Sequence, residues 1–285
     1  MRELALSDTV RRFLGKELSD SSKEKEMRWI RPIVLFIIAL DAIAQLARPS
    51  DFNWKGVVPP GQAVEIKGVN GAVHVKRAPG AEVLVEATKT ARHNDPGSVS
   101  IQVVPHATGV TICAVYPSSN GQNECHPGTE GRMNVNNNDV RVEFTVALPA
   151  GVNFVGRTVN GEIEATSLSS DVEAYTVNGK IRISTRGRAA ARTVNGSIYA
   201  RMGQPSWPKP LEFNTVNGGI ELELPSNVNA SVRATTVNGH ISTDFPLMIR
   251  GRFTGHHIYG SIGQGGQDLS VKTVNGSIDL RRAVI

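Results

Sequence analysis

A small set of acidic side chains could supply acid–base chemistry. Glycoside hydrolysis needs two carboxylates that face each other about 5–10 Å apart. The acids that could gather on one face of this chain are Glu162, Glu164, Glu221 and Asp279. We expect Lys180 and Arg182 to separate the nearer levels and Asp279 to lie several repeats away, so no acid pair is expected on neighbouring levels. We therefore assign no catalytic residue and keep a carbohydrate-active enzyme only as an alternative.

Other chemical motifs are weak or missing from the sequence. The chain has no G-x-S-x-G, H-E-x-x-H or P-loop motif. His256 and His257 are consecutive, so in a strand they would point to opposite faces. The polar run 136–139 lacks the alternating acidic spacing of a calcium loop. We predict neither a metal nor a cofactor.

The two cysteines, Cys113 and Cys125, flank a turn-rich segment. In an exported protein this pattern favours one disulfide closing a short loop, worth about 2–3 kcal/mol. Two unpaired thiols are the first alternative. A metal site with His106 and His126 is a weaker alternative, because no C-x-x-C spacing is present.

The strongest signal is a repeated tetrapeptide. Thr-Val-Asn-Gly occurs six times, beginning at 158, 176, 193, 215, 236 and 273, with a degenerate copy at 257–260 and a related GVNG at 68–71. A period near 20 residues is typical of solenoids and repeat arrays. An x-Ile-x triplet follows each copy, and this alternation is typical of a strand with one inward side chain.

These features predict an all-β solenoid of about seven coils, with the Asn-Gly corners aligned in one column. A β-meander with Asn-Gly hairpin turns fits less well, because the other end of each repeat is variable. Aromatic residues make up only 5% of the chain, which indicates an aliphatic core. The predicted asparagine ladder contains Asn160, Asn178, Asn195, Asn217, Asn238 and Asn275. The predicted inward residues are Ile163, Ile181, Ile198, Ile220, Ile241, Ile262 and Ile278.

Stacking in sequence order carries further expectations for the surface. Glu162 should lie over Lys180, and Glu164 over Arg182, as exposed ion pairs between coils. The last copy should end the stack, where its arginines at 281–282 would discourage end-to-end growth.

One aromatic side chain is a candidate contact with a partner. Trp207 lies among the prolines of the insertion 203–210, which keep this segment out of a central strand. We expect a loop with an aromatic tip suited to a partner or a sugar. The alternative is that Trp207 folds back over the coils.

The N-terminal region has the character of an export signal. The apolar run 33–40 is too short to span a membrane and fits a signal h-region, with Arg28 and Arg31 before it and a small-x-small site ending at Ala44. Met27 could be the true start. The alternative is an uncleaved membrane anchor, in which case this segment would be the only part of the protein that contacts the membrane. The chain then divides into 1–44 (charged segment and signal or anchor), 45–56 (linker), 57–157 (β-rich cap) and 158–285 (repeat solenoid).

The order VEIKGVNGAVHV, EVLVEATKT, VRVEFTVALPAGVNFVGRTVNGEIEA and then TVNGxI units resembles the putative-adhesin family of bacterial envelope proteins, over residues 57–282. That family is catalogued largely as domains of unknown function. The resemblance implies a non-catalytic envelope β-solenoid, an adhesin or structural scaffold that binds a surface protein or polysaccharide. An envelope-stress or partner-binding scaffold is the alternative. The net charge of +5, without a basic arm, argues against a nucleic-acid partner.

Overall fold

The structure is a computed structural model that describes residues 51–118, 123–129, 133–249 and 256–283. The predicted signal, with its h-region at 33–40 and cleavage after Ala44, lies outside these residues. Within the described ranges, no helix is long and apolar enough to cross a membrane.

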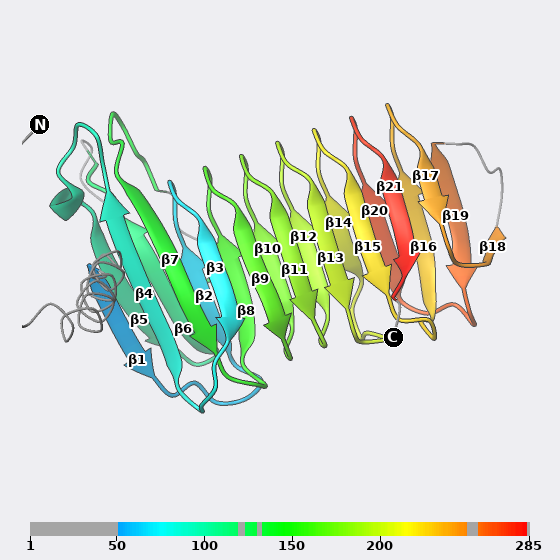
Figure 1. The fold of residues 1–285 in the computed structure, drawn as a ribbon, viewed down its shortest axis with the longest axis horizontal. Coiled ribbons are helices and arrows are strands. Elements are labelled where there is room, and N and C mark those ends of the chain that lie inside the picture. Colours follow the sequence, from blue (N-terminus) through cyan, green and yellow to red (C-terminus); the bar gives the residue numbers. More distant parts are fainter. Residues whose placement is uncertain (1–50, 119–122, 130–132, 250–255, 284–285) are drawn as a thin grey trace, which may run out of the picture. The chain divides into compact units, whose positions relative to one another are not determined.

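Two sheets, here called A and B, contain all the strands (Figure 1). In spatial order, sheet A holds β1 (Phe52–Gly56), β4 (Val83–Thr90), β7 (Arg141–Leu148), β3 (Val73–Arg77), β9 (Ile163–Leu168), β11 (Ile181–Thr185), β13 (Ile198–Met202), β15 (Ile220–Leu224), β21 (Ile278–Arg282) and β17 (Ile241–Thr243). Sheet B holds β18 (Leu247–Ile249), β19 (His257–Ile262), β16 (Ala230–Thr235), β20 (Asp268–Lys272), β14 (Leu211–Asn214), β12 (Ala189–Arg192), β10 (Val172–Tyr175), β8 (Asn153–Arg157), β2 (Ala63–Lys67), β6 (Gly109–Val115) and β5 (Ser100–His106). One short 3₁₀ turn, η1 (Pro96–Ser98), precedes β5.

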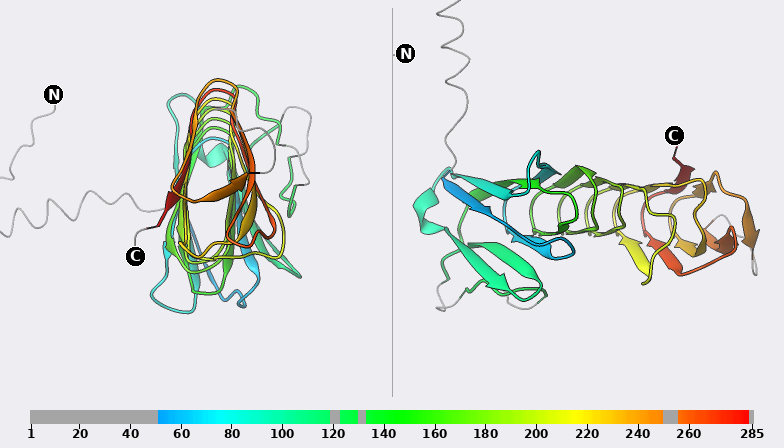
Figure 2. Two further views of the ribbon diagram at one scale, coloured as in Figure 1. Left: turned by 90° about the vertical axis from the view of Figure 1, so that its right-hand side faces the viewer. Right: turned by 90° about the horizontal axis from the view of Figure 1, so that it is seen from below.

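The core lies between the two sheets, which face each other across a narrow coil (Figure 2). Burial alternates along the repeat strands, for example in β11, where Ile181 and Ile183 point inward and Arg182 points outward. Strands with this period bury one face and leave the other to solvent. The seven predicted inward isoleucines are all buried.

Each central coil places one strand in each sheet and joins them through a TVNG corner. The coils β8–β9, β10–β11, β12–β13 and β14–β15 stack in sequence order with parallel pairing, so Ile163, Ile181, Ile198 and Ile220 stand in one row. The predicted all-β solenoid is confirmed. Seven corners align, and the first of them is the GVNG copy at 68–71.

The order of coils at the ends differs from the prediction. The last coil, β20–β21, lies between β14–β15 and β16–β17, so the C-terminal repeat is the second coil from its end. The first repeat, β2–β3, similarly lies between β6–β7 and β8–β9. Because the TVNG coils share one motif, they present equivalent surfaces to their neighbours, and the motif itself does not specify the order of the coils.

The prediction that residues 257–260 form a degenerate coil of the stack is also wrong. This segment belongs to β19, which pairs antiparallel with β16 and β18 in sheet B. A strand running in this direction cannot continue the parallel stack, and it covers the sheet edge instead. At the other end, β5 covers β6, while β4 and β1 cover β7, again in antiparallel pairs.

The arginines at the end of β21 do not cap the stack, because β21 is an interior strand. Arg281 contacts Asp244 and Asp279 through its guanidinium, at 3.4 and 3.3 Å. The backbone N–H of Arg282 donates to Asp244. These contacts fasten the last coil to the loop that follows β17.

Candidate functional site

The asparagines of the repeat form one continuous ladder of side-chain hydrogen bonds. The Nδ2 of each TVNG asparagine donates to the Oδ1 of an asparagine on the adjacent coil at 2.7–2.8 Å, and Asn70 accepts the bond at one end. In spatial order the ladder runs Asn70, Asn160, Asn178, Asn195, Asn217, Asn275, Asn238. The threonine of each TVNG copy also donates to a glycine carbonyl of the neighbouring coil, as Thr176 does to Gly161 at 2.9 Å. This corner therefore holds the coils together.

Glycine at this corner is required by close packing. A Cβ on Gly179 would lie 2.0 Å from the carbonyl oxygen of Gly161, and one on Gly196 would meet Gly179 in the same way. The Asn-Gly pairs are thus not the hairpin turns that their sequence often indicates. They are sites where two backbones approach too closely for any side chain.

The outer face of sheet A carries an open hollow of about 340 Å³. Its lining includes the row Ser197, Gly219, Ser277, whose members directly precede β13, β15 and β21 and lie on neighbouring coils. Lys180 lies beyond one end of this row and His240 beyond the other. Small residues between two larger ones create the depression.

Two acidic residues on neighbouring strands line this hollow, contrary to the expectation that they lie several coils apart. Glu221 and Asp279 are register partners on β15 and β21, because the last coil is inserted next to β15. Ser242 donates to Asp279 from the other side. Both carboxylates project from the same face of one sheet, so they lie on one side of any ligand and do not flank it as a glycosidase pair would.

The predicted register of the neighbouring charges is correct, but the predicted ion pairs are wrong. Glu164 and Arg182 are register partners. However, Glu164 contacts His74 at 3.5 Å, and Arg182 lies 5.1 Å from the ring centre of Tyr199. Neither Glu162–Lys180 nor Glu164–Arg182 forms an ion pair in the described part of the chain. Cation–π stacking competes for the guanidinium, as is common for arginine.

Tyr199 fixes the next row of polar side chains. Its hydroxyl donates to Glu223 at 2.5 Å. Burial, together with this hydrogen bond and the negative charge of Glu223, raises the pKa of Tyr199 to about 12. The phenol therefore stays protonated and acts as a hydrogen-bond donor.

Trp207 does not form an exposed tip. Its side chain is only 5% exposed and packs into the core between the sheets. Its Nε1 has no hydrogen-bond partner among the described residues. The prolines keep the insertion out of a strand, as predicted, but burying the large indole is more favourable than exposing it. Trp207 is therefore not a partner contact.

The two cysteines form a disulfide, Cys113–Cys125.

Glu65, which the sequence analysis missed, anchors the loop around Gly128 that follows Cys125. Its buried carboxylate accepts hydrogen bonds from the Gly128 N–H, the Thr111 hydroxyl and Arg157 Nε, each at 2.8 Å. Glu65 occupies an outward position of β2, and no sequence signal indicated that a loop would cover it.

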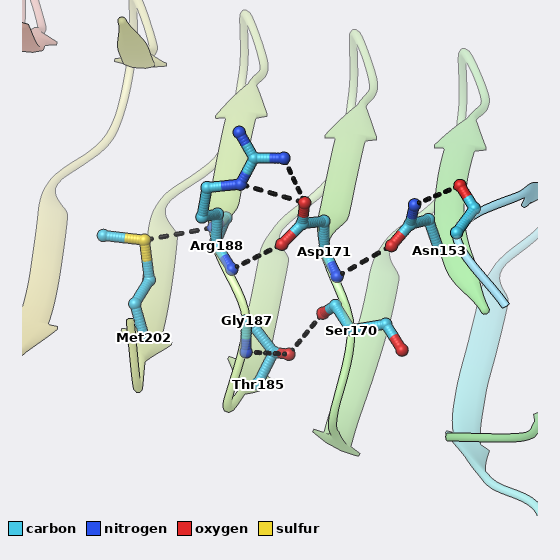
Figure 3. Close-up of polar contacts among 9 residues, drawn as sticks. Asn153, Ser170, Asp171, Thr185, Gly187, Arg188 and Met202 are labelled. Carbon is cyan, nitrogen blue, oxygen red and sulfur yellow. Dashed lines mark hydrogen bonds and ion pairs between the residues drawn. The ribbon is translucent and has the colours of Figure 1, made fainter. Parts of the chain in front are cut away.

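A second polar ladder holds the corner opposite the asparagines (Figure 3). Asn153 Oδ1 accepts from the Asp171 N–H at 3.2 Å, and Asp171 accepts from the N–H and the guanidinium of Arg188. Burial raises the pKa of Asp171, but the hydrogen bonds and charge of Arg188 outweigh it, so the pKa lies below 3.8. Asp171 is thus an ionised structural group.

The polar run 136–139 and the histidines serve local structure. Asp139 accepts backbone N–H bonds from Asn94, Arg92 and His93, and these hydrogen bonds lower its pKa to about 2. The carboxylate oxygens of Asp139 are occupied by these N–H donors, so they are not arranged to bind a cation. His256 and His257 are both exposed. No group of three or more His, Cys, Asp or Glu within the described ranges is arranged to hold a metal ion.

Comparison with known proteins agrees with this architecture. Residues 58–281 match the family model described as Toastrack DUF4097. A structure from Clostridium sporogenes described as a "putative cell adhesion protein" is 12% identical, with a TM-score of 0.41 over 81% of this chain and 99% of that one. A "putative adhesin" from Bacteroides fragilis is 10% identical, with a TM-score of 0.26 over 82% and 99%. No curated protein matches the sequence. Because the family model spans most of its length, the chain belongs to the Toastrack DUF4097 family.

Proposed function

We propose that this protein is a non-catalytic, exported component of the cell envelope that acts as an adhesin or structural surface scaffold. The observation that carries the proposal is the continuous stack of coils joined by the asparagine ladder. Such a stack presents outward side chains in rows about 4.8 Å apart on a rigid support. A surface of this kind suits the binding of an extended polymer at several points.

Export is supported by the disulfide, because such bonds persist in oxidising compartments. The signal-like segment 33–44 also supports export. Mass spectrometry of the native protein tests this part. We expect the mature chain to begin at Gln45 and the cysteines to be bonded. A chain that begins at Met1 or Met27 with free thiols would contradict export.

Adhesion is tested by incubating the purified residues 45–285 with an array of bacterial and host glycans and with isolated cell envelopes. We expect saturable retention of the protein without any change in the glycan. A protein that binds neither glycans nor envelopes would contradict an adhesive role, while retention on an envelope protein alone would favour the partner-binding scaffold.

The adjacency of Glu221 and Asp279 supports a second candidate, a carbohydrate-active enzyme. Two carboxylate residues that line the same hollow could contact one bound glycan and act on it as general acid and general base. The test is the release of reducing ends from polysaccharides by the wild type and by the variants Glu221→Gln and Asp279→Asn. We expect no release above background. Turnover that both variants abolish would establish the enzyme and overturn the non-catalytic proposal.

A further inference from the structure

A groove of about 600 Å³ lies at the corner opposite the asparagine ladder, on the side of sheet A. We call it the arginine groove. It runs across several coils, from the end of β3 to the residues that follow β15 and β21. Its charged and hydroxyl-bearing residues include Arg77, Arg186, Arg201, Ser167, Ser184 and Ser226. All three ionisable side chains among its described lining residues are cationic.

Two of these cations are available to a ligand. Arg77 and Arg186 are exposed, and their side chains make no hydrogen bond or ion pair with the described residues. Arg201 is held by Glu223 at 3.3 Å, so its guanidinium is fixed at the groove. A guanidinium binds a carboxylate or a phosphate through two parallel hydrogen bonds. The groove is therefore suited to an anion.

Strand β9, the second level of the groove counted from β3, has a local distortion. The pairing of β9 with β11 shifts register between Ile183 and Thr185, which indicates an extra residue in β9. Ser167 has a φ of +58°, a conformation uncommon for serine, and it is exposed. Bulges redirect side chains and are frequent beside binding sites. Here the bulge turns a hydroxyl outward between Arg77 and Arg186.

The spacing of the cations matches a polymer that runs along the stack. Arg77 ends β3 and Arg186 follows β11, with β9 between them. At about 4.8 Å per strand, the two arginines lie on levels about 10 Å apart. Arg201, on β13, lies one level further. Charges at this interval favour a chain with an anionic group on successive or alternate units.

We infer that the arginine groove binds an acidic polysaccharide whose sugar rings carry carboxylate groups. The lining also contains Leu168, Met202 and Pro225, together with serine hydroxyls. A sugar ring offers an apolar C–H face and hydroxyl groups to such a lining, whereas a polyphosphate chain offers neither. The inference rests on the proposed adhesive function and specifies its ligand class.

The test uses residues 45–285 and the probe polygalacturonate, with a neutral galactan and polyphosphate as comparison polymers. The groove variant is the double substitution Arg77→Gln and Arg186→Gln. The matched control is Lys76→Gln with Arg182→Gln, which removes two exposed positive charges from neighbouring positions that do not line the groove. Binding is measured by biolayer interferometry, and thermal unfolding shows that each variant is folded.

We expect the wild type and the control to bind polygalacturonate with Kd values within about threefold of each other. We expect the groove variant to bind at least about tenfold more weakly, because two charge-assisted contacts are lost. Binding should weaken as salt is raised, because exposed charges are screened. Equal weakening in both double variants would overturn the inference, since it would indicate general surface charge. Polyphosphate binding as tight as that of polygalacturonate would overturn the assignment to a saccharide.

The outcomes separate the inference from the proposed function. Wild-type protein that binds a neutral glycan or cell envelopes but ignores polygalacturonate would overturn the groove ligand and leave adhesion standing. Failure to bind any of these materials would overturn both.

Discussion

The two corners of each coil differ in almost every respect. At the asparagine corner, six coils repeat the same four uncharged residues, and the valines and asparagines hydrogen-bond to the equivalent residues of the next coil. At the opposite corner, the segments 167–171, 185–188, 203–210 and 225–229 have unrelated sequences and range from four to eight residues in length. The first corner is uniform because the coils must fit one another there. The second is free to vary, and the exposed arginines and serines of the groove gather at it.

The difference has a simple physical basis. At the asparagine corner, the backbone N–H groups of successive valine and asparagine residues donate to one valine carbonyl of the neighbouring coil, as Val177 and Asn178 do to Val159. The glycine that follows lies against the backbone of that coil. No side chain fits at the glycine position of this column. The opposite corner has fewer close approaches, notably Gly187 against Ser170 and Gly203 against Arg186.

The largest effect is expected where the asparagine corner is tightest. Gly179→Ala would place a Cβ 2.0 Å from the Gly161 carbonyl oxygen, so the two coils must separate. We expect a loss of about 3 kcal/mol or more in the free energy of unfolding. Chemical denaturation measures it. The control is Gly80→Ala, whose Cβ would meet nothing within 4 Å. Equal stability of the two variants would remove the basis of the comparison.

The asparagine ladder should contribute less than the glycine contacts. Asn178 donates to Asn160 and accepts from Asn195, each at 2.7 Å. We expect Asn178→Ala to cost about 1–2 kcal/mol, since two hydrogen bonds are lost. Asn227→Ala, at the opposite corner, is the matched control and should change stability by less than about 0.5 kcal/mol. Urea denaturation midpoints compare the two variants, and a reversed order would contradict the distinction between the corners.

The opposite corner should show its own stabilising contact through pH dependence. The folded pKa of Asp171 lies below its unfolded value of 3.8, so the ion pair with Arg188 contributes stability above pH 3.8 and loses it as the pH falls through the folded pKa. We expect Asp171→Asn to be less stable than the wild type at pH 7 by about 1 kcal/mol, since the pair is partly exposed. The difference should shrink below pH 3.8. A constant difference down to pH 2 would show that the charge of Asp171 does not matter.

The smallest effect concerns the bulge in β9. Glycine adopts positive φ without strain, so we expect Ser167→Gly to raise the free energy of unfolding by about 0.5 kcal/mol. Differential scanning calorimetry would detect the corresponding rise in Tm. A clear fall in Tm would instead show that the serine hydroxyl stabilises the bulge.

The sequence predicted the regular part of the fold and failed at its ends. The TVNG copies and the alternating isoleucines determine the local geometry of a coil, so the corner column and the register of Glu164 with Arg182 could be predicted. The position of the last coil could not be predicted, because nothing in a TVNGxI unit distinguishes one neighbour from another. For the same reason, the pairing of Glu221 with Asp279 as register partners was not predicted.

Side chains outside the repeat were harder to place. The spacing of the prolines at 205–210 indicated a loop, but only the structure shows that Trp207 turns inward and is buried in the core. Glu65 occupies an outward strand position, and its burial depends on a loop more than 60 residues away. Likewise, the arginine groove brings together Arg77 and Arg186 from segments that share no motif.

The inserted last coil has a consequence for how the molecule is made. Strands β14 and β16 do not pair with each other, nor do β15 and β17, because β20 and β21 separate them. Residues 268–282 therefore join two portions of the polypeptide that precede them in the sequence. Strands β16 and β17 can complete the parallel stack only after β20 and β21 have paired with β14 and β15, so this end of the stack assembles out of chain order.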